Sequence, residues 1–244
     1  MKIDVYTTPA EVSETALQGN GVVVMDILRA GTTICQALRS GCKEIIPVAS
    51  IEQAIDLAGN LIKDKTLLCG ERNGIIIPGF NLGNSPFEYT SERVAGKSLI
   101  FTTTNGTVAL DKAKRAREVV IGGFVNFLSI LEFMKRWESD ISLLCAGDKG
   151  RLSLEDSVCA GMFVWHLKRY FGKDVHLTDS ARAVEILYGK FKNKLGELVS
   201  TTAHGLYLRS IKFEEDVKLC AQIDALPIIP IYRKNKVVRY EEAK

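Results

Sequence analysis

The chain has 244 residues, of which 46% are hydrophobic and 25% are charged, so it has enough apolar sequence to bury a sizeable core. The formal net charge is +3 and no block of like charges occurs, which argues against a nucleic-acid-binding protein. No apolar run approaches the roughly 18 residues that span a bilayer. Residues 1–6 lack a signal-peptide pattern, so we expect a soluble cytoplasmic protein.

Apolar runs rich in Val, Ile and Leu alternate with helical patterns through the first two thirds of the chain. The apolar runs predict buried strands at residues 21–26, 44–48, 66–69, 98–102, 118–121 and 141–145. The patterns between them predict helices at residues 33–40, 51–62, 106–116, 126–137 and 154–170. This alternation favours an α/β fold, a three-layer α/β/α sandwich with a largely parallel or mixed sheet.

Two segments depart from this alternation. Residues 70–96 are rich in glycine but carry apolar anchors, which predicts an ordered functional loop. Residues 178–224 read mainly as helices, and we expect a terminal strand at residues 228–232. We interpret residues 1–244 as a single domain, in which two similar strand–turn–helix units leave open two related subdomains with a boundary near residues 120–140.

The first candidate site follows the strand that leads to Asp26. Ligands of parallel α/β sheets bind beyond the carboxyl ends of the strands, where Asp26 is placed to hold a metal or to attack phosphorus. Arg29 can pair with an anion, and Thr32 and Thr33 lie in the first turn of a helix whose free N–H groups also favour one. The alternative is an ordinary helix start beside a surface arginine.

The second candidate site follows the strand at residues 98–102. Its residues offer hydroxyl groups, an amide and a glycine at a helix start, which is a suitable cup for an anion. They are Thr103, Thr104, Asn105, Gly106 and Thr107. An ordinary strand–helix turn is the alternative, but such a turn needs fewer hydroxyl groups.

Two further loops carry charged or amide groups after predicted strands. In the first, Glu71 can ligate a hard cation, Arg72 can clamp an anion, and Asn84 and Ser85 add polar groups. In the second, Glu155 and Asp156 are adjacent acids suited to Mg²⁺ at a helix start. Helix capping by the S-x-x-D pattern and a solvated salt bridge are the structural alternatives.

A competing pattern runs from Cys145 to Arg151, which have the Cys-x5-Arg spacing of cysteine-dependent phosphatases. Asp148 would lie inside that cradle and repel phosphate, so we rank this interpretation lower. None of the cysteines forms a C-x-x-C pair, which argues against a cysteine zinc site and favours reduced thiols. His204 can serve as an acid or base, but its helical context favours a structural role.

Taken in chain order, these motifs resemble the 2-phosphosulfolactate phosphatase family. The resemblance spans about residues 1–230 and is carried by Val23-Val24-Met25-Asp26-Ile27-Leu28-Arg29-Ala30, Gly70-Glu71-Arg72, Gly79-Phe80-Asn81-Leu82-Gly83-Asn84-Ser85-Pro86, Thr103-Thr104-Asn105-Gly106-Thr107 and Ala146-Gly147 with Ser153-Leu154-Glu155-Asp156. One departure is that the family commonly has Ala-Thr-Thr after the arginine, where this chain has Ala30-Gly31-Thr32-Thr33.

The resemblance implies a Mg²⁺-dependent phosphatase that cleaves 2-phospho-3-sulfolactate to 3-sulfolactate and phosphate, a reaction of coenzyme M biosynthesis in methanogens. The physiological substrate can also be another 2-phosphorylated hydroxy acid. On this hypothesis the metal ligands are carboxylates among Asp26, Glu71, Glu155 and Asp156, while Arg29 and Arg72 pair with the substrate's anionic groups. Water attacks phosphorus directly, or Asp26 attacks first.

Two rival interpretations stay open beside this one. A cysteine-dependent phosphatase would use Cys145 and Arg151, and a non-catalytic protein would only bind anionic metabolites. The expected partner is a small molecule with a phosphate and a sulfonate or carboxylate, without nucleic acid or membrane, and a homo-oligomer is left open. A haloacid-dehalogenase-type site is disfavoured because Leu28 stands where that family has a second acid.

Overall fold

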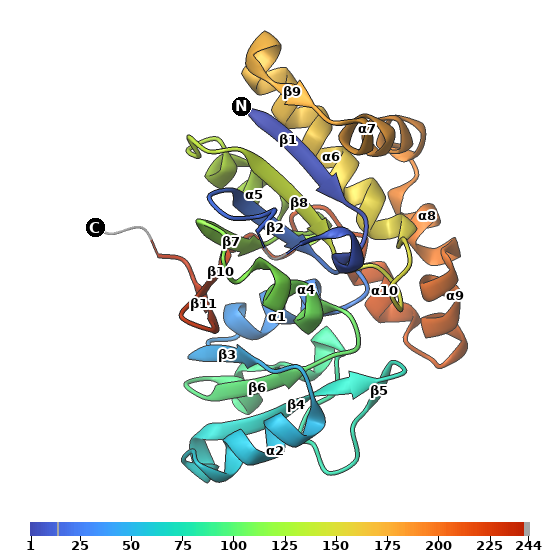
Figure 1. Ribbon diagram of the computed structural model, residues 1–244. Coiled ribbons are helices and arrows are strands. Elements are labelled where there is room, and N and C mark those ends of the chain that lie inside the picture. Colours follow the sequence, from blue (N-terminus) through green and yellow to red (C-terminus); the bar gives the residue numbers. More distant parts are fainter. Residues whose placement is uncertain (14, 242–244) are drawn as a thin grey trace.

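A computed structural model describes residues 1–13 and 15–241, in which one mixed, open sheet of eleven strands carries the fold. Figure 1 shows the sheet running through the whole molecule. In spatial order the strands are β5 (Ile75–Ile76), β4 (Thr66–Arg72), β6 (Ser98–Thr102), β3 (Glu44–Pro47), β11 (Lys236–Arg239), β10 (Pro230–Arg233), β7 (Glu118–Ile121), β2 (Gly21–Met25), β8 (Ile141–Cys145), β1 (Lys2–Tyr6) and β9 (His176–Leu177).

The sheet consists of two parallel groups joined by a C-terminal hairpin. Strands β4, β6 and β3 form one parallel group, and β7, β2, β8, β1 and β9 form the other. The β10–β11 hairpin lies between them and pairs antiparallel with β7 and β3. The predicted largely parallel or mixed sheet is therefore confirmed. Strand β2 pairs with both β7 and β8, while the subdomain boundary near residues 120–140 stays a prediction.

Helices cover the sheet on both faces and complete the predicted three-layer sandwich. The described α-helices are α1 (Ala30–Arg39), α2 (Ile51–Gly59), α3 (Ser91–Val94), α4 (Gly106–Ala113), α5 (Phe127–Met134), α6 (Leu154–Phe171), α7 (Asp179–Phe191), α8 (Leu195–Thr201), α9 (Ala203–Ser210) and α10 (Glu214–Cys220). Each predicted helix and strand lies within a few residues of an observed one. The predicted terminal strand at 228–232 corresponds to β10, whereas β1, β5, β9 and β11 were not predicted.

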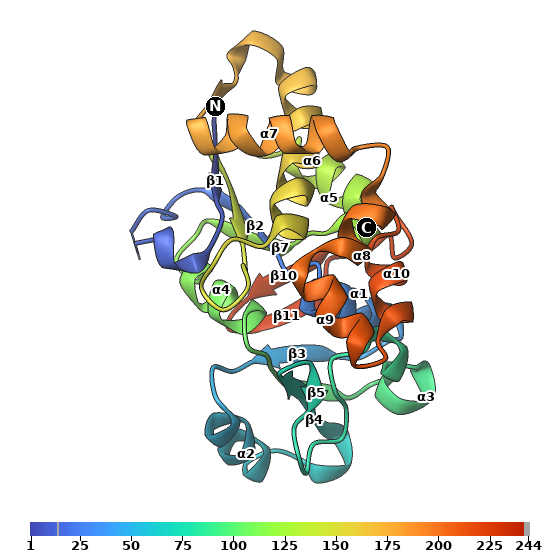
Figure 2. The same cartoon turned by 90° about the vertical axis from the view of Figure 1, so that its right-hand side faces the viewer.

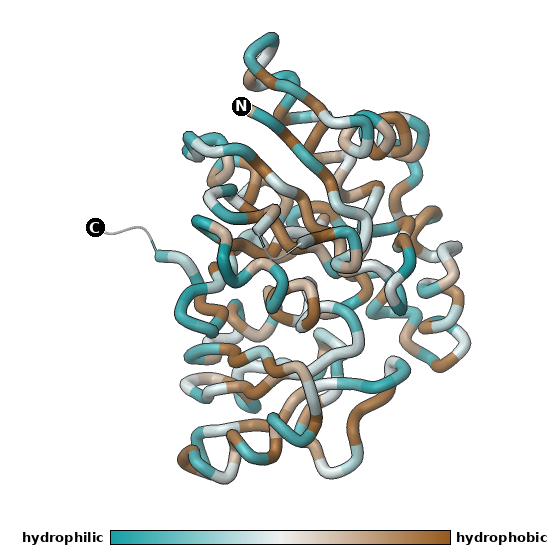
Figure 3. The backbone as a smooth tube through the Cα atoms, in the orientation of Figure 1, coloured by the Kyte–Doolittle hydropathy of each residue, from teal (hydrophilic) through white to brown (hydrophobic). Residues whose placement is uncertain are grey.

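The alternation of side chains along β2 shows how the two cores form. Val23 and Met25 face a core to which α5, α6 and α7 contribute, whereas Val22 and Val24 face a second core with α1 and α4. Successive strand residues point to opposite faces, so a strand with helices on both sides must be apolar throughout. Figure 3 shows the resulting concentration of hydrophobic residues along the central strands.

The ends of β2, β6 and β8 lead into loops on one side of the molecule. Helices α8, α9 and α10 stand on the same side, and Figures 1 and 2 show them next to these loops. The predicted loop at residues 70–96 is ordered: β4 continues to Arg72, and β5 and two short helical turns follow. This side of the molecule therefore brings together the loops that carry the candidate residues.

Within the described part of the chain, no helix has the length and apolar character needed to cross a membrane.

Candidate active site

A cavity of about 230 Å³ opens where the strand-end loops meet helix α9. It is lined by the loops that follow β2, β4, β6 and β8 and by the first turns of α9. The lining residues are Asp26, Leu28, Arg29, Glu71, Asn73, Gly74, Asn84, Thr103, Thr104, Asn105, Asp148, Lys149, Ala203, His204 and Tyr207. Loops far apart in the sequence thus share one polar cavity, as expected for an α/β active site.

Asp26 lies at the end of β2 and is buried in the cavity wall. Its Oδ1 accepts a hydrogen bond of 3.1 Å from the N–H of Ala30, in the first turn of α1. Burial and the charges of Glu71 and Glu155 raise the pKa of Asp26 to about 7, although the Ala30 N–H and Arg29 act in the opposite direction. A carboxyl group with this pKa holds a proton in a large share of molecules at neutral pH.

Two glycines let the main chain close around Asp26. A Cβ on Gly106 would lie 2.7 Å from Asp26 Oδ2, and a Cβ on Gly31 would lie 2.8 Å from the Asp26 main-chain oxygen. Both distances are too short for a real side chain. The start of α4, in the predicted threonine-rich cup, can therefore pack against Asp26 only because residue 106 is glycine. In the same way, α1 can begin close to the main chain of Asp26 because residue 31, the inserted residue of this chain, is glycine.

Glu71 connects two of the predicted loops. Its Oε2 accepts a bond of 2.7 Å from the N–H of Gly74, and its Oε1 accepts one of 2.9 Å from the N–H of Thr104. Arg72 does not line the cavity; its guanidinium donates to the Glu71 main-chain oxygen and to Thr102 Oγ1. Glu71 and Arg72 thus fix the loop geometry, and the side chain of Arg72 is engaged within the protein.

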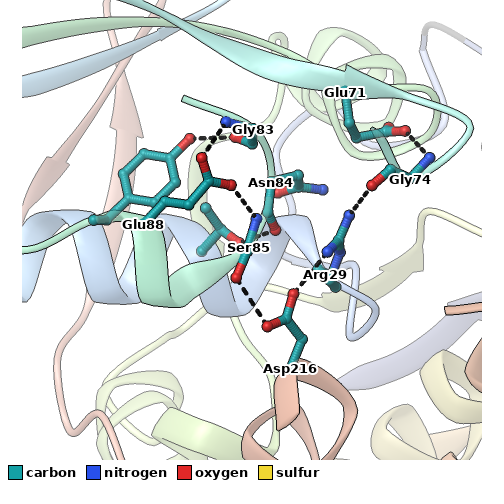
Figure 4. Close-up of polar contacts among 10 residues, drawn as sticks. Arg29, Glu71, Gly74, Gly83, Asn84, Ser85, Glu88 and Asp216 are labelled. Carbon is teal, nitrogen blue, oxygen red and sulfur yellow. Dashed lines mark hydrogen bonds and ion pairs between the residues drawn. The ribbon is translucent and has the colours of Figure 1, made fainter. Parts of the chain in front are cut away.

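Arg29 lines the cavity from within a buried network (Figure 4). Its Nη1 donates to Asp216 Oδ2 at 2.7 Å and its Nη2 donates to the Gly74 main-chain oxygen at 2.6 Å. The other carboxylate oxygen of Asp216 accepts a bond of 2.8 Å from Ser85 Oγ. The side chains of Arg29 and Asp216 are only 2% and 4% exposed, and the Arg29 guanidinium stacks on the Phe213 ring. Much of the hydrogen-bonding capacity of Arg29 is therefore used inside the protein.

The buried side chain of Asn84, in the cavity wall, carries an oxygen atom without a hydrogen-bond partner among the described residues. Its Oδ1 has no hydrogen-bond partner in the described structure, whereas its main-chain oxygen accepts a bond from Thr33 Oγ1 at 2.9 Å. A buried amide without a partner is costly, and such groups commonly await a ligand or a water molecule. Asn84 lines the cavity beside the Arg29 network (Figure 4), which fits its predicted place in substrate binding.

Asp156 and Glu155 occupy different positions at the start of α6. Asp156 accepts hydrogen bonds from the N–H groups of Ile27 (2.9 Å) and Gly147 (3.1 Å), so it ties the loops after β2 and β8 together. Burial and the charges of Glu155 and Asp26 raise the pKa of Asp156 well above its usual range. Glu155 lies 3.9 Å from Nδ1 of His204, which lines the cavity from α9.

Among the described residues, no group of three or more His, Cys, Asp or Glu side chains is arranged to hold a metal ion. Both carboxylate oxygens of Glu71 and of Asp156 already accept main-chain hydrogen bonds. Magnesium, however, needs only one or two carboxylates together with water and phosphate oxygens. The buried and partly protonated carboxyl of Asp26 fits such a site, whereas a cage of all four predicted acids is not preformed.

The predicted site residues divide into two sets. Those that line the cavity are Asp26, Arg29, Glu71, Asn84, Thr103, Thr104 and Asn105. Those that do not line it are Thr32, Thr33, Arg72, Ser85, Gly106, Thr107, Glu155 and Asp156. Thr107, for example, donates its hydroxyl to the Thr103 main-chain oxygen at 3.1 Å, and Thr33 donates to Asn84.

Sequence reasoning missed Tyr207 and Asp216 and ranked His204 as structural. These residues come from the helical segment α9–α10, which no strand-end pattern marks. A polar residue on a helix between apolar positions is usually a solvated one. The sequence therefore carried no signal for the place of His204 and Tyr207 in the cavity wall, or for the contact of Asp216 with Arg29.

The thiol of Cys145 is poorly suited to phosphate chemistry. The residue is fully buried in the sheet, and burial raises the pKa of its thiol well above the ordinary value, with a contribution from the charge of Asp156. A nucleophilic cysteine needs the opposite environment, one that is accessible and lowers the thiol pKa. Arg151 is exposed and does not line the cavity.

Comparison with known proteins agrees with this geometry. The model of the 2-phosphosulpholactate phosphatase family matches residues 6–235. A probable 2-phosphosulfolactate phosphatase of Caldanaerobacter subterraneus subsp. tengcongensis is 38% identical over 239 residues, which cover 98% of either chain. A probable 2-phosphosulfolactate phosphatase of Thermotoga maritima is 39% identical over 228 residues, covering 93% of this chain and 94% of the relative. The chain therefore belongs to the 2-phosphosulpholactate phosphatase family, whose named activity is that of a phosphoric monoester hydrolase.

Proposed function

We propose that this protein is a Mg²⁺-dependent phosphatase that hydrolyses 2-phospho-3-sulfolactate, or a closely related 2-phospho-hydroxy acid, to the hydroxy acid and phosphate. Family membership supports the reaction, and the substrate named for the relatives supports the substrate class. A cytoplasmic location, a role in coenzyme M biosynthesis and a homo-oligomeric state stay predictions.

The charge of the cavity is the observation that carries the metal dependence. A substrate with phosphate, carboxylate and sulfonate groups must enter a cavity lined by Asp26, Glu71 and Asp148. Burial, together with the charges of Glu71 and Glu155, already raises the pKa of Asp26 to about 7. A divalent cation would relieve the repulsion among the carboxylates and also the repulsion between the carboxylates and the substrate. It favours the ionised carboxylate and the anionic substrate together. Bound by Asp26, Mg²⁺ would offset the charge that builds on the phosphoryl oxygens in the transition state.

The chain's own residues bind and orient the substrate. Thr103 and Thr104 line the cavity just before the first turn of α4, whose N-terminal end favours an anion. Asn84 adds an amide with unused hydrogen-bonding capacity. Together they form the phosphate-binding wall of the cavity.

Hydrolysis breaks the bond between phosphorus and the C2 oxygen of the substrate. On one route a water oxygen attacks phosphorus, one proton of the water is lost and the leaving oxygen takes up a proton. On the other route an Asp26 carboxylate oxygen attacks first, and water then cleaves the aspartyl phosphate. Labelling with ³²P-substrate followed by acid quenching separates the two routes, because only the second leaves label on the protein.

The deciding experiment measures phosphate release from 2-phosphosulfolactate after exhaustive EDTA treatment and again after adding Mg²⁺. We expect activity to fall by at least about a hundredfold without the metal and to return with it. Activity that survives EDTA would remove the metal from the proposal. Binding without phosphate release in the presence of Mg²⁺ would instead indicate a sensor of anionic metabolites.

A further inference from the structure

We propose that Lys149 binds the sulfonate group of the substrate and so sets the preference for a sulfonated over an unsulfonated 2-phospho-acid. This inference rests on the proposed function, and it concerns the part of the substrate that does not react. It assigns a specificity-determining role to a side chain in the loop between β8 and α6.

The basic side chains of the cavity wall differ in how strongly they are already engaged. Arg29 forms a buried ion pair with Asp216. Nδ1 of His204 lies 3.9 Å from Glu155 Oε1, and burial lowers the pKa of the imidazole. Lys149 lines the cavity, is exposed, and has no carboxylate partner within 4.0 Å in residues 1–13 and 15–241. Of the three, Lys149 therefore has a positive charge that is not neutralised by an ion pair.

The position of Lys149 is fixed by its main chain. Asp148 and Arg151 exchange two main-chain hydrogen bonds of 2.9 Å, with Lys149 and Gly150 between them in a tight two-residue turn. Both central residues have positive φ, 50° for Lys149 and 76° for Gly150, which is the pattern of a type I′ turn. A lysine in this strained region is uncommon, since glycine or asparagine adopts it more readily.

A side-chain contact links this turn to the phosphate-binding wall. The N–H of Lys149 donates a bond of 3.1 Å to Oδ1 of Asn105, which follows Thr103 and Thr104 in the cavity lining. The main chain of Lys149 is thereby tied to the segment that carries the proposed phosphate-binding threonines. Phosphate and sulfonate lie on adjacent carbon atoms of the substrate, so two anion sites close together are what recognition requires.

The chemistry of lysine suits a sulfonate better than a planar carboxylate. An ammonium group is a compact charge with three donors that can rotate, whereas the arginine fork matches two oxygens of a planar carboxylate. A sulfonate presents three equivalent oxygens at a tetrahedral sulfur. Because Lys149 is exposed and its attraction is screened by solvent, we expect its contribution to be about tenfold in kcat/KM.

The test compares Lys149→Met and Lys149→Arg with the wild type on two substrates, 2-phosphosulfolactate and 2-phospholactate, which lacks the sulfonate. We expect Lys149→Met to lower kcat/KM about tenfold for the sulfonated substrate, mainly through KM, and less than about twofold for 2-phospholactate. Lys149→Arg should retain most of the preference. Arg151→Met is the matched control, because it changes an exposed cation of the same turn that does not line the cavity.

Equal losses on both substrates, or no loss on the sulfonated one, would overturn the role of Lys149. Equal wild-type kcat/KM values for the two substrates would do so as well. Calorimetric binding of 3-sulfolactate and of lactate, with wild type and Lys149→Met, gives a result independent of turnover. If the wild type hydrolyses neither substrate but binds 3-sulfolactate more tightly than Lys149→Met does, the proposed function fails and the Lys149 assignment stands.

Discussion

The cavity has two walls of different origin. One wall consists of the end of β4, with Glu71, and of the loops that follow β2, β4, β6 and β8, with Asp26 and Thr103 to Asn105. The other consists of α9, with His204 and Tyr207, and is anchored through Asp216 of α10. The first wall carries groups suited to phosphate chemistry, whereas the second fixes and encloses them. We therefore expect substitutions in the strand-end wall to reduce turnover, and substitutions in the helical wall to reduce stability or substrate affinity.

The largest effect on turnover is expected for Asp26→Asn. The substitution keeps the size of the side chain and the acceptor for the Ala30 N–H, but it removes the charge that can hold a metal or attack phosphorus. We expect kcat to fall by about 10³-fold or more. Phosphate release under saturating substrate and Mg²⁺ measures the loss.

The stability of the same variant provides the control. Burial raises the pKa of Asp26 in the folded protein to about 7. A raised carboxyl pKa means that the folded state binds more protons, so wild-type stability falls as pH rises from about 4 to about 7. In EDTA, Asp26→Asn should therefore gain stability relative to the wild type over this range in urea denaturation. A variant that is both unfolded and inactive would not support a catalytic Asp26.

Cys145→Ser sharpens the distinction between the carboxylate and thiolate mechanisms. In the wild type the thiol of Cys145 is buried, and burial raises its pKa. We therefore expect the variant to keep kcat within about threefold of the wild type. Loss of turnover in a Cys145→Ser variant that unfolds at the wild-type urea concentration would reverse our ranking of the two mechanisms.

In the helical wall the largest expected effect is on stability. Asp216→Ala leaves the charge of Arg29 buried without its partner and also removes the acceptor for Ser85. Breaking a buried pair in this way costs about 3–5 kcal/mol, which urea denaturation can measure. Asp111→Ala is the control, since it breaks an exposed pair with Lys114 and should cost less than about 1 kcal/mol. Equal costs for the two variants would contradict the structural role of the Asp216 network.

Gly106→Ala tests whether the walls depend on close packing around Asp26. The new Cβ would lie 2.7 Å from Asp26 Oδ2 and 3.0 Å from the Ala30 Cβ, so the carboxyl group or the start of α4 must move. We expect about a hundredfold loss of kcat/KM, because small displacements of a reacting group are costly. In Gly59→Ala, at the exposed end of α2, the Cβ meets nothing within 4 Å and activity should not change. Wild-type activity in Gly106→Ala would show that Asp26 tolerates displacement.

The two walls also differ in how far the sequence predicts them. Asp26 and the turn at Thr103 each follow a buried apolar strand, and Glu71 lies near the end of β4. The strand ends of an α/β sheet lie near its ligand site. The sequence therefore predicts that side of the cavity from local patterns. It does not distinguish lining groups from supporting ones, because that depends on side-chain direction: Arg72 and Thr33 bond to neighbouring segments of the protein.

Long-range partners explain what the sequence could not predict. Asp216 meets Arg29 across 187 residues and Ser85 across 131, and its short helix has an ordinary acidic first turn. Strand β11 was missed because its four residues, taken from the sequence alone, resemble an exposed tail. They form a strand because they pair with β10 on one side and β3 on the other. Such partners emerge from tertiary packing and leave no periodic pattern in the sequence.

A small effect is expected where the two walls touch. The hydroxyl group of Tyr207 donates a bond of 2.9 Å to the main-chain oxygen of Asn73, and both residues line the cavity. Tyr207→Phe removes only this exposed bond, so stability should fall by less than about 1 kcal/mol. We expect kcat to stay unchanged while KM rises a few-fold, because the loop after β4 is held less firmly during binding. A large fall in kcat at unchanged KM would place Tyr207 among the reacting groups, and the division of labour between the walls would then be wrong.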